Sequence, residues 1–240
     1  DVLAWLFRGL FTRRVRLGRT AFITQVVRIG VRSIGIVMLV CGCVGFILAL
    51  QMQPALADFG QVDKIANIVS VAILRELGPL ISAIVLTGFA GAAIAAEVGT
   101  MVVGEEIEAL EAHALNPVRF LVVPRVVATT LSLVLLTVIG DITAVIASGA
   151  MTVGFLDVPY ELYKTNTLDQ VGLSDFYTGL FKAGIFGVIL SLIACHNGLK
   201  VTGGAAGVGR ATTDTVVQSV VAVIVADLLF TWVFFKLGFT

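Results

Sequence analysis

The chain has 240 residues, of which 58% are hydrophobic and 13% charged, and its acidic and basic residues balance. Charged residues are about half as frequent as in typical soluble domains, which excludes an ordinary soluble globular protein. Because one crossing of a bilayer takes roughly 20 apolar residues, several crossings use nearly the whole chain. We predict a single all-α, polytopic membrane domain over residues 1–240.

Residues 2–32 carry seven arginines and no acidic residue, interleaved with aromatic and aliphatic side chains. This pattern predicts an amphipathic helix in the membrane interface, with its apolar side at the acyl boundary and its arginines at anionic headgroups. The alternative is a positively charged flank that only fixes the topology. The arginines are Arg8, Arg13, Arg14, Arg16, Arg19, Arg28 and Arg32.

Five apolar runs follow, and each predicts a transmembrane helix. They are residues 34–50, 65–96, 126–153, 176–195 and 216–235. Gln51, Gln53 and Pro54 close the first run. The second run is about 48 Å long as a helix, too long for one straight crossing. We therefore expect it to tilt, protrude or kink, with Gly78-Pro79 as the place of the kink.

The connections between the runs differ in charge, and this difference predicts the orientation in the membrane. Basic residues gather in the N-terminal segment and in the connections 105–125 and 200–210, whereas 58–64 and 157–175 are rich in acids. We therefore expect the N-terminus on the cytoplasmic side and the C-terminus on the outer side.

Several ionisable residues fall inside or beside the predicted spans. They are Arg75, Glu76, Glu97, Asp141 and Asp227. Such a group near the bilayer centre costs roughly 2.5–3.5 kcal/mol and marks a candidate functional site. Arg75 and Glu76 point about 100° apart on a helix, so each needs another partner or water. Pro79 also lacks the amide that would bond the carbonyl of Arg75, and the sequence predicts a polar, hydrated notch here.

The position of Arg75 along its helix suggests what it contacts. Arg75 precedes Glu97 by roughly 33 Å along a straight helix, so it lies near the outer leaflet if Glu97 lies near the cytoplasm. A guanidinium there could form paired hydrogen bonds with a phosphate headgroup. The alternative is that Arg75 only anchors the helix at the interface.

A small-residue tract and a short amphipathic segment come next. Residues 88–96 repeat small side chains at spacings of three and four, which predicts close helix packing. Residues 104–116, ending at Asn116-Pro117, predict a short helix with acidic and apolar faces. This helix could dock on a soluble cytoplasmic partner or be a solvated loop helix. Its relevant residues are Glu105, Glu106, Ile107, Glu108, Leu110, Glu111 and Leu115.

No motif in the sequence indicates covalent chemistry or nucleotide binding. Residues 204–209, followed by Arg210, lack the lysine and the hydroxyl of a phosphate-binding loop. Gly203, Gly204, Gly207 and Gly209 instead predict a flexible cytoplasmic turn. The three cysteines and two histidines have neither metal-ligand nor catalytic spacing. We expect no catalytic residue, metal or cofactor in the chain, and no nucleic-acid partner.

Three blocks resemble the MlaE/YrbE permeases: residues 75–79 (RELGP), 91–97 (GAAIAAE) and 105–110 (EEIEAL). The resemblance covers nearly the whole chain, and further matches are Asn116-Pro117, Pro124-Arg125, residues 210–213 (RATT) and Asp227. It implies the permease subunit of an ABC transporter that moves glycerophospholipids from or to a periplasmic carrier. Such a protein lies in the bacterial inner membrane and contributes to outer-membrane lipid asymmetry.

The resemblance also implies partners. Two permease copies would pair with two cytoplasmic ATPases, which hold the ATP and magnesium, and with a periplasmic ring of MCE-domain proteins. A small cytoplasmic regulatory subunit is a further candidate partner. Two alternatives stay open: the same architecture carrying a sterol or another hydrophobic solute, and a non-transporting scaffold for the ATPase and the ring.

Residue roles follow from the resemblance in two places. The helix over residues 105–115 would be the coupling helix that contacts the ATPase. The lipid pocket would lie at the homodimer interface under the ring, lined by Leu48, Leu56, Phe59, Arg75 and Glu76. One position departs from the family pattern, because many members have a basic residue where this chain has Phe89.

Overall fold

The computed structural model describes residues 19–238, which form helices and short connections with no strand among them. The α-helices are α2 (Arg19–Ile29), α3 (Ile34–Ala57), α4 (Ile65–Ala72), α5 (Gly78–Leu86), α6 (Ala92–Val103), α7 (Glu106–Ala112), α8 (Val123–Phe155), α9 (Tyr160–Gln170), α10 (Leu173–Leu199) and α11 (Gly204–Leu237). Short 3-10 turns are η1 (Val31–Ser33) and η2 (Val62–Lys64), and π-turns are η3 (Ile73–Leu77), η4 (Thr87–Gly91) and η5 (Val118–Val122).

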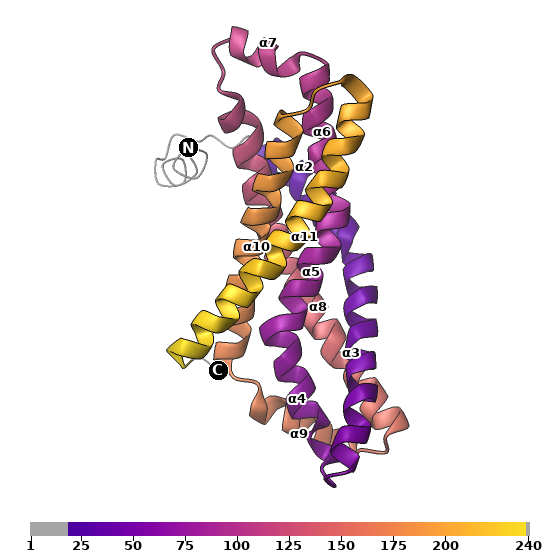
Figure 1. Cartoon of the computed structure of the whole chain (residues 1–240). Helices are drawn as coiled ribbons and strands as arrows, with labels where there is room; N and C mark the ends of the chain where they lie inside the picture. Colours follow the sequence, from indigo (N-terminus) through magenta and orange to yellow (C-terminus); the bar gives the residue numbers. More distant parts are fainter. Residues whose placement is uncertain (1–18, 239–240) are drawn as a thin grey trace.

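Five helical segments of the described chain are long and apolar enough to cross a membrane, as the sequence predicted. They are Phe22–Ala57, Val62–Val103, Val118–Phe155, Leu173–Leu199 and Gly204–Leu237. They run alternately up and down, so that α7 and the α10–α11 connection lie at one end of the bundle (Figure 1). The α3–α4 connection and α9 lie at the other end. The chain is thus a multi-pass membrane protein.

Most spans extend beyond their predicted ends. Helix α3 does not stop at residue 50 but continues through Pro54 to Ala57. Pro54 removes a single hydrogen bond, and the helix pattern resumes after it, because the amide of Asp58 donates to the carbonyl of Pro54 at 3.3 Å. Helix α11 likewise begins at Gly204, so most of the predicted glycine-rich turn is helical.

The N-terminal segment and the connection 157–175 also differ from the predictions. Of the predicted interfacial helix over residues 2–32, the structure describes α2 and η1, and residues 2–18 lie outside the described part. The predicted acidic loop 157–175 contains a helix, α9. Its buried Tyr163 forms hydrogen bonds with the Ser148 hydroxyl at 2.6 Å and the Val145 carbonyl at 3.0 Å.

The second span meets Gly78-Pro79 with a π-turn. In η3 the amide of Gly78 donates to the carbonyl of Ile73, five residues back. This wider turn adjusts the backbone bonds just before the proline, and the helix continues through η4 to the end of α6. Residues 62–103 therefore form one long rod with two π-turns.

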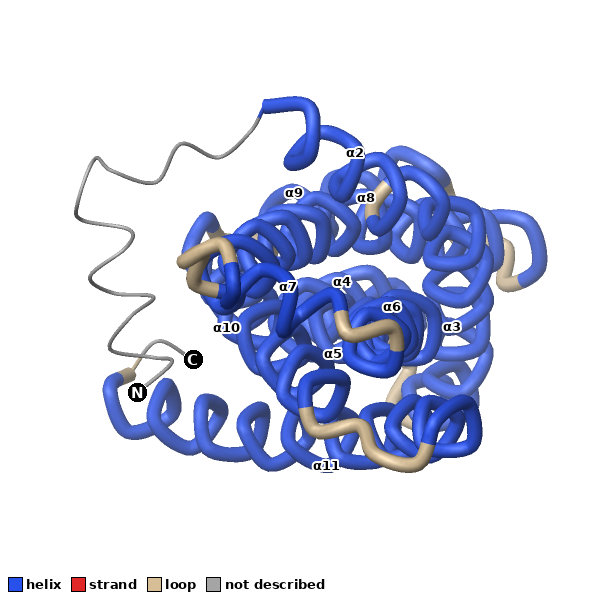
Figure 2. Tube along the Cα trace, turned by 90° about the horizontal axis from the view of Figure 1, so that it is seen from above, coloured by secondary structure: helices blue, strands red, loops and turns tan. Residues whose placement is uncertain are grey.

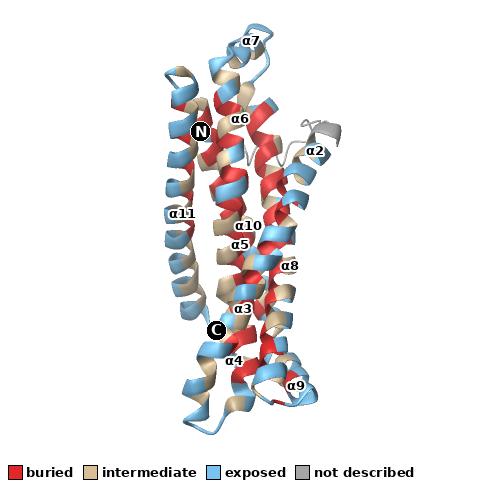
Figure 3. Cartoon of the chain, turned by 90° about the vertical axis from the view of Figure 1, so that its right-hand side faces the viewer, coloured by how far each residue is buried: buried red, intermediate tan, exposed pale blue. Residues whose placement is uncertain are grey.

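Glycines set how closely the helices approach. At Gly45 of α3 an added Cβ would lie 2.1 Å from the carbonyl oxygen of Ala144 in α8. At Gly91, in the predicted small-residue tract, an added Cβ would lie 2.8 Å from Leu190 of α10. Helix α11 lies along one side of the bundle and leaves much of its length exposed (Figures 2 and 3). Its buried positions are Gly207, Ala211, Thr215, Ser219 and Val223.

Substitution of Gly45 tests the close contact between α3 and α8. We expect Gly45→Ala to lower stability by about 1–3 kcal/mol, because the added methyl overlaps the α8 backbone. Gly35→Ala on the same helix is the matched control, since nothing lies within 4 Å of its Cβ position. Thermal unfolding of both purified variants in detergent measures the difference. Equal melting temperatures would contradict this packing.

Candidate functional site

A buried lysine connects three membrane-spanning segments. The Lys182 side chain on α10 is 1% exposed. Its amine donates hydrogen bonds to Glu76 Oε2 of η3 at 2.6 Å, and to Asp227 Oδ1 and Thr231 Oγ1 of α11 at 3.0 and 2.9 Å. Thr231 in turn donates to Glu76 Oε1 at 2.9 Å. We call these four residues the lysine cluster.

Arg75, next to Glu76 in the sequence, has a different partner. Its Nε forms an ion pair with Oδ1 of Asp175 in the first turn of α10. The Asp175 side chain is 3% exposed, and its other oxygen accepts the amide of Gly172 at 2.9 Å. A carboxylate in this first turn also interacts favourably with the helix dipole. Arg75 is therefore held at the start of α10, while Glu76 reaches the lysine farther along the same helix.

These contacts agree with the expectation that Arg75 and Glu76 do not neutralise each other. Their charged partners, Asp175 and Lys182, both lie on α10, at least 100 residues away in the sequence. In the lysine cluster, two carboxylates share one ammonium group, so each charge has an opposite charge in contact. Removing the lysine leaves the two carboxylates next to each other without a cation, which is the costly case.

A second charged cluster lies toward the α7 end of the bundle. Glu97 of α6 forms ion pairs with Arg28 of α2 at 3.1 Å and with Arg125 of α8 at 3.2 Å. The Arg125 side chain is buried, and its Nη1 also donates to the carbonyl of Leu121 at 2.9 Å. Glu97 thus joins three helices, and we call these residues the glutamate cluster.

Asp141 belongs to neither cluster. Its side chain on α8 is buried, and its Oδ1 has no hydrogen-bond partner among the described residues. It lies against Gly78, where an added Cβ would be only 1.6 Å from this oxygen. The missing side chain of Gly78 therefore makes room for the carboxyl group of Asp141 beside Pro79.

The predicted lining residues occupy different environments. Leu48 and Leu56 of α3 are partly buried and pack against the core. Phe59, in the turn after α3, is 79% exposed. Arg75 and Glu76 are tied to α10 and α11, as described above. The lining of a lipid pocket by these five residues stays a prediction.

The sequence analysis did not identify three of the residues that pair with Arg75 and Glu76 or belong to the lysine cluster. They are Asp175, Lys182 and Thr231. Lys182 could have been found, because it is an ionisable residue inside the apolar run 176–195. Asp175 was assigned to a connection, and a threonine in a membrane helix carries no distinguishing signal.

The predicted coupling helix is shorter than expected. Helix α7 covers only Glu106–Ala112, after Glu105 in a left-handed conformation (φ 59°). Ile107 and Leu110 are half-buried, whereas the acidic side chains and Leu115 are exposed. The helix thus projects an acidic surface from the end of the bundle (Figure 1). Its contact with an ATPase stays a prediction.

The three sequence blocks that resemble a permease family include Arg75, Glu76 and Glu97 of the charged groups, and most of α7. The family model described as "Permease MlaE" matches residues 22–233, nearly all of the described chain. The chain belongs to the MlaE permease family.

Curated relatives of this MlaE permease come from bacteria and from a plant chloroplast. A "probable ABC transporter permease protein" of Rickettsia felis is 38% identical over 89% of this chain and 83% of the relative. A "probable ABC transporter permease protein" of Synechocystis is 33% identical over 92% of this chain and 84% of the relative. The chloroplastic Arabidopsis thaliana protein TRIGALACTOSYLDIACYLGLYCEROL 1 is 32% identical over 88% of this chain and 61% of the relative.

The lysine cluster can be tested by removing its positive charge. We expect Lys182→Met to destabilise the protein by about 1–3 kcal/mol, because Glu76 and Asp227, which are both partly shielded from solvent, then face each other without a cation. The triple variant Lys182→Met, Glu76→Gln, Asp227→Asn removes all three charges and should recover most of the loss. Thermal unfolding in detergent compares them. A triple variant no more stable than Lys182→Met would show that the charges do not depend on one another.

Proposed function

We propose that the chain is the permease subunit of an ATP-driven transporter that moves glycerophospholipids between the bacterial inner membrane and a periplasmic MCE-protein carrier. Membership of the MlaE family and relatives named as ABC transporter permeases support the transport role. A relative whose name refers to a galactosylated diacylglycerol supports a glycerolipid cargo. Through this transport, the protein contributes to the lipid asymmetry of the outer membrane.

The observation that carries the cargo assignment is the state of Arg75. Its side chain is 28% exposed and uses Nε for Asp175, while its terminal nitrogens have no hydrogen-bond partner among residues 22–238. A guanidinium with free terminal N–H groups can form forked hydrogen bonds with a phosphate. Because Asp175 fixes the Nε side, the fork is oriented before a lipid arrives. The lysine cluster beside it fixes the neighbouring helices.

The orientation follows from the distribution of basic residues. The α7 end carries Arg28, Arg119, Arg125, Lys200 and Arg210. The positive-inside rule places this end in the cytoplasm. The N-terminus is then cytoplasmic, the C-terminus is periplasmic, and Arg75 lies in the periplasmic half of the membrane.

The working transporter is larger than this chain. We propose a homodimer bound to two cytoplasmic ATPases, which hold the ATP and magnesium, and to a periplasmic ring of MCE-domain proteins. A small regulatory subunit on the cytoplasmic side is a further partner in this assignment. The permease itself makes and breaks no covalent bonds. Its contribution is to bind the lipid and to change shape when the ATPases close.

Movement can pass along the rod formed by residues 62–103. Helix α7 follows α6 directly, so a push on α7 acts on the end of this rod. The same rod carries Glu97 in the glutamate cluster, and Arg75 and Glu76 near its other end. We propose that closure of the ATPases shifts the rod, narrows the space near Arg75 and releases the lipid toward the carrier.

Arg75 variants test the headgroup contact. We expect Arg75→Lys to lower phospholipid occupancy because one ammonium cannot replace the fork, and Arg75→Gln to lower it further, by roughly tenfold. Native mass spectrometry with identification of the released lipids measures occupancy. Unchanged occupancy in both variants would return Arg75 to the anchoring role, and a bound sterol would reject the glycerophospholipid assignment.

Helix α7 variants test the coupling role separately. We expect Leu110→Arg to lower co-purification of the ATPase at least several-fold, because it places a bulky charge in the short helix. Leu168→Arg, on exposed α9 at the opposite end, is the matched control. Gel filtration verifies that both variants stay monodisperse. ATPase association and transport that both survive Leu110→Arg would leave α7 as a solvated loop helix.

A further inference from the structure

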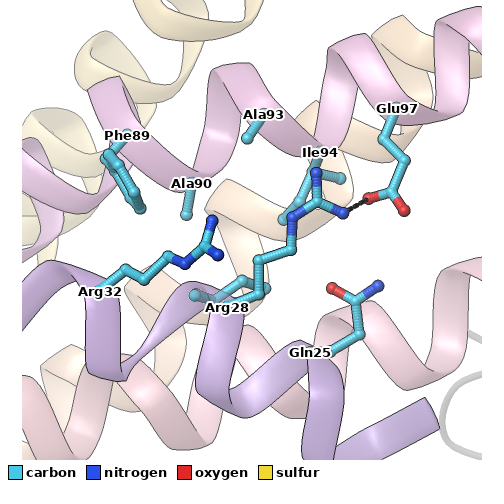
Figure 4. A pocket seen from close by; sticks show the side chains of 9 residues that line it. Gln25, Arg28, Arg32, Phe89, Ala90, Ala93, Ile94 and Glu97 are labelled. Carbon is cyan, nitrogen blue, oxygen red and sulfur yellow. Dashed lines mark ion pairs between the residues drawn. The ribbon is translucent and has the colours of Figure 1, made fainter.

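A groove lies between the first helical segment and the rod, close to the glutamate cluster. It has a volume of about 150 Å³. Arg28 and Arg32 extend into it from α2 and η1, and they face η4 and α6 (Figure 4). The opposite wall consists of Phe89, Ala90, Ala93 and Ile94, with Glu97 beyond it.

The groups around the groove carry excess positive charge. Glu97 is already shared between Arg28 and Arg125. Arg32 is exposed and has no ion pair or hydrogen bond from its side chain within residues 22–238. A guanidinium without a partner beside an apolar wall is complementary to a singly charged anion that has an apolar portion.

The size and surroundings of the groove identify the class of occupant. Its volume is below the roughly 300–1,000 Å³ of sites that enclose a complete small ligand. The groove therefore holds one segment of a larger molecule. Val27 and Val31, which each precede one of the two arginines in the sequence, are exposed and apolar, so this part of the chain adjoins the bilayer rather than open water. The rest of the occupant can lie among the lipids.

We propose that this groove binds an anionic phospholipid of the leaflet at the α7 end. The phosphate diester pairs with Arg32 at the mouth, next to the Arg28–Glu97 ion pair. The upper part of an acyl chain lies against Phe89 and Ala93. This lipid stabilises the contact between α2 and α6, and it is distinct from a lipid at Arg75. The proposal depends on the membrane location of the chain and not on the transported cargo.

Retention of lipid by purified protein tests the site. The full chain is reconstituted in nanodiscs of mixed phosphatidylglycerol and phosphatidylcholine, transferred to detergent and analysed by native mass spectrometry. We expect the protein to retain phosphatidylglycerol in preference to phosphatidylcholine. Arg32→Gln should reduce this retention roughly tenfold, the value of one charge-assisted hydrogen bond. Ala93→Phe, at an exposed position, should reduce it by filling the apolar wall.

A matched control separates the groove from general surface charge. Arg210→Gln removes an exposed arginine of α11 at the same end of the bundle, outside the groove, and should leave retention unchanged. Equal losses in Arg32→Gln and Arg210→Gln would overturn the proposal in favour of general attraction to the surface. Complete displacement of the lipid by soluble glycerol 3-phosphate would overturn it in favour of a simple anion site. The two proposals can fail separately. If no lipid depends on Arg75 while the groove still retains phosphatidylglycerol, only the proposed cargo site is rejected.

Discussion

The ammonium group of Lys182 sits within a membrane-spanning bundle, and much of the architecture serves to keep it paired. A lone charge there is expensive, so Glu76, Asp227 and Thr231 must stay within hydrogen-bond distance of it. These partners come from the rod and from α11, and the lysine comes from α10. Ion pairs and hydrogen bonds therefore fix the relative positions of the three segments, in addition to apolar packing. This matters most for α11, whose last buried residue is Val223. The later turns of α11 contact the bundle through this pairing and through Phe230, whose ring packs edge-on against Phe181 of α10.

The glutamate cluster plays a corresponding part at the other end of the same rod. Glu97 ties the rod to α2 and α8, while Glu76 ties it to α10 and α11. Ion pairs between side chains thus hold the rod at two positions along its length, and between these positions it packs through small residues. A helix held in this way moves as a unit more readily than it bends. Such stiffness suits the proposed movement, in which a push on α7 is carried along the rod to the proposed headgroup contact at Arg75.

The sequence predicted the membrane class and the five spans because long apolar runs leave few other structures. It also singled out Arg75 and Glu76, since adjacent charges before a proline are rare in a membrane helix. Their partners could not be derived, because partnership depends on which faces of distant helices meet. The end of α3 was misplaced for a similar reason: Pro54 alone is a stop signal, yet the surrounding residues sustain the helix. Helix α9 was missed because a polar segment has no strong helical periodicity.

The π-turn η3 has a consequence for how this chain can vary. A π-turn accommodates one extra residue per turn without breaking the helix, and here it lies immediately before Pro79 and contains both Arg75 and Glu76. The directions of the two side chains are therefore set by the number of residues in this turn as well as by their identity. Loss of one residue between Ile73 and Leu77 would rotate Arg75 and Glu76 relative to the whole later part of the rod. A substitution of an apolar residue of similar size in this segment keeps that register, whereas an insertion or deletion within it would separate the charges from α10.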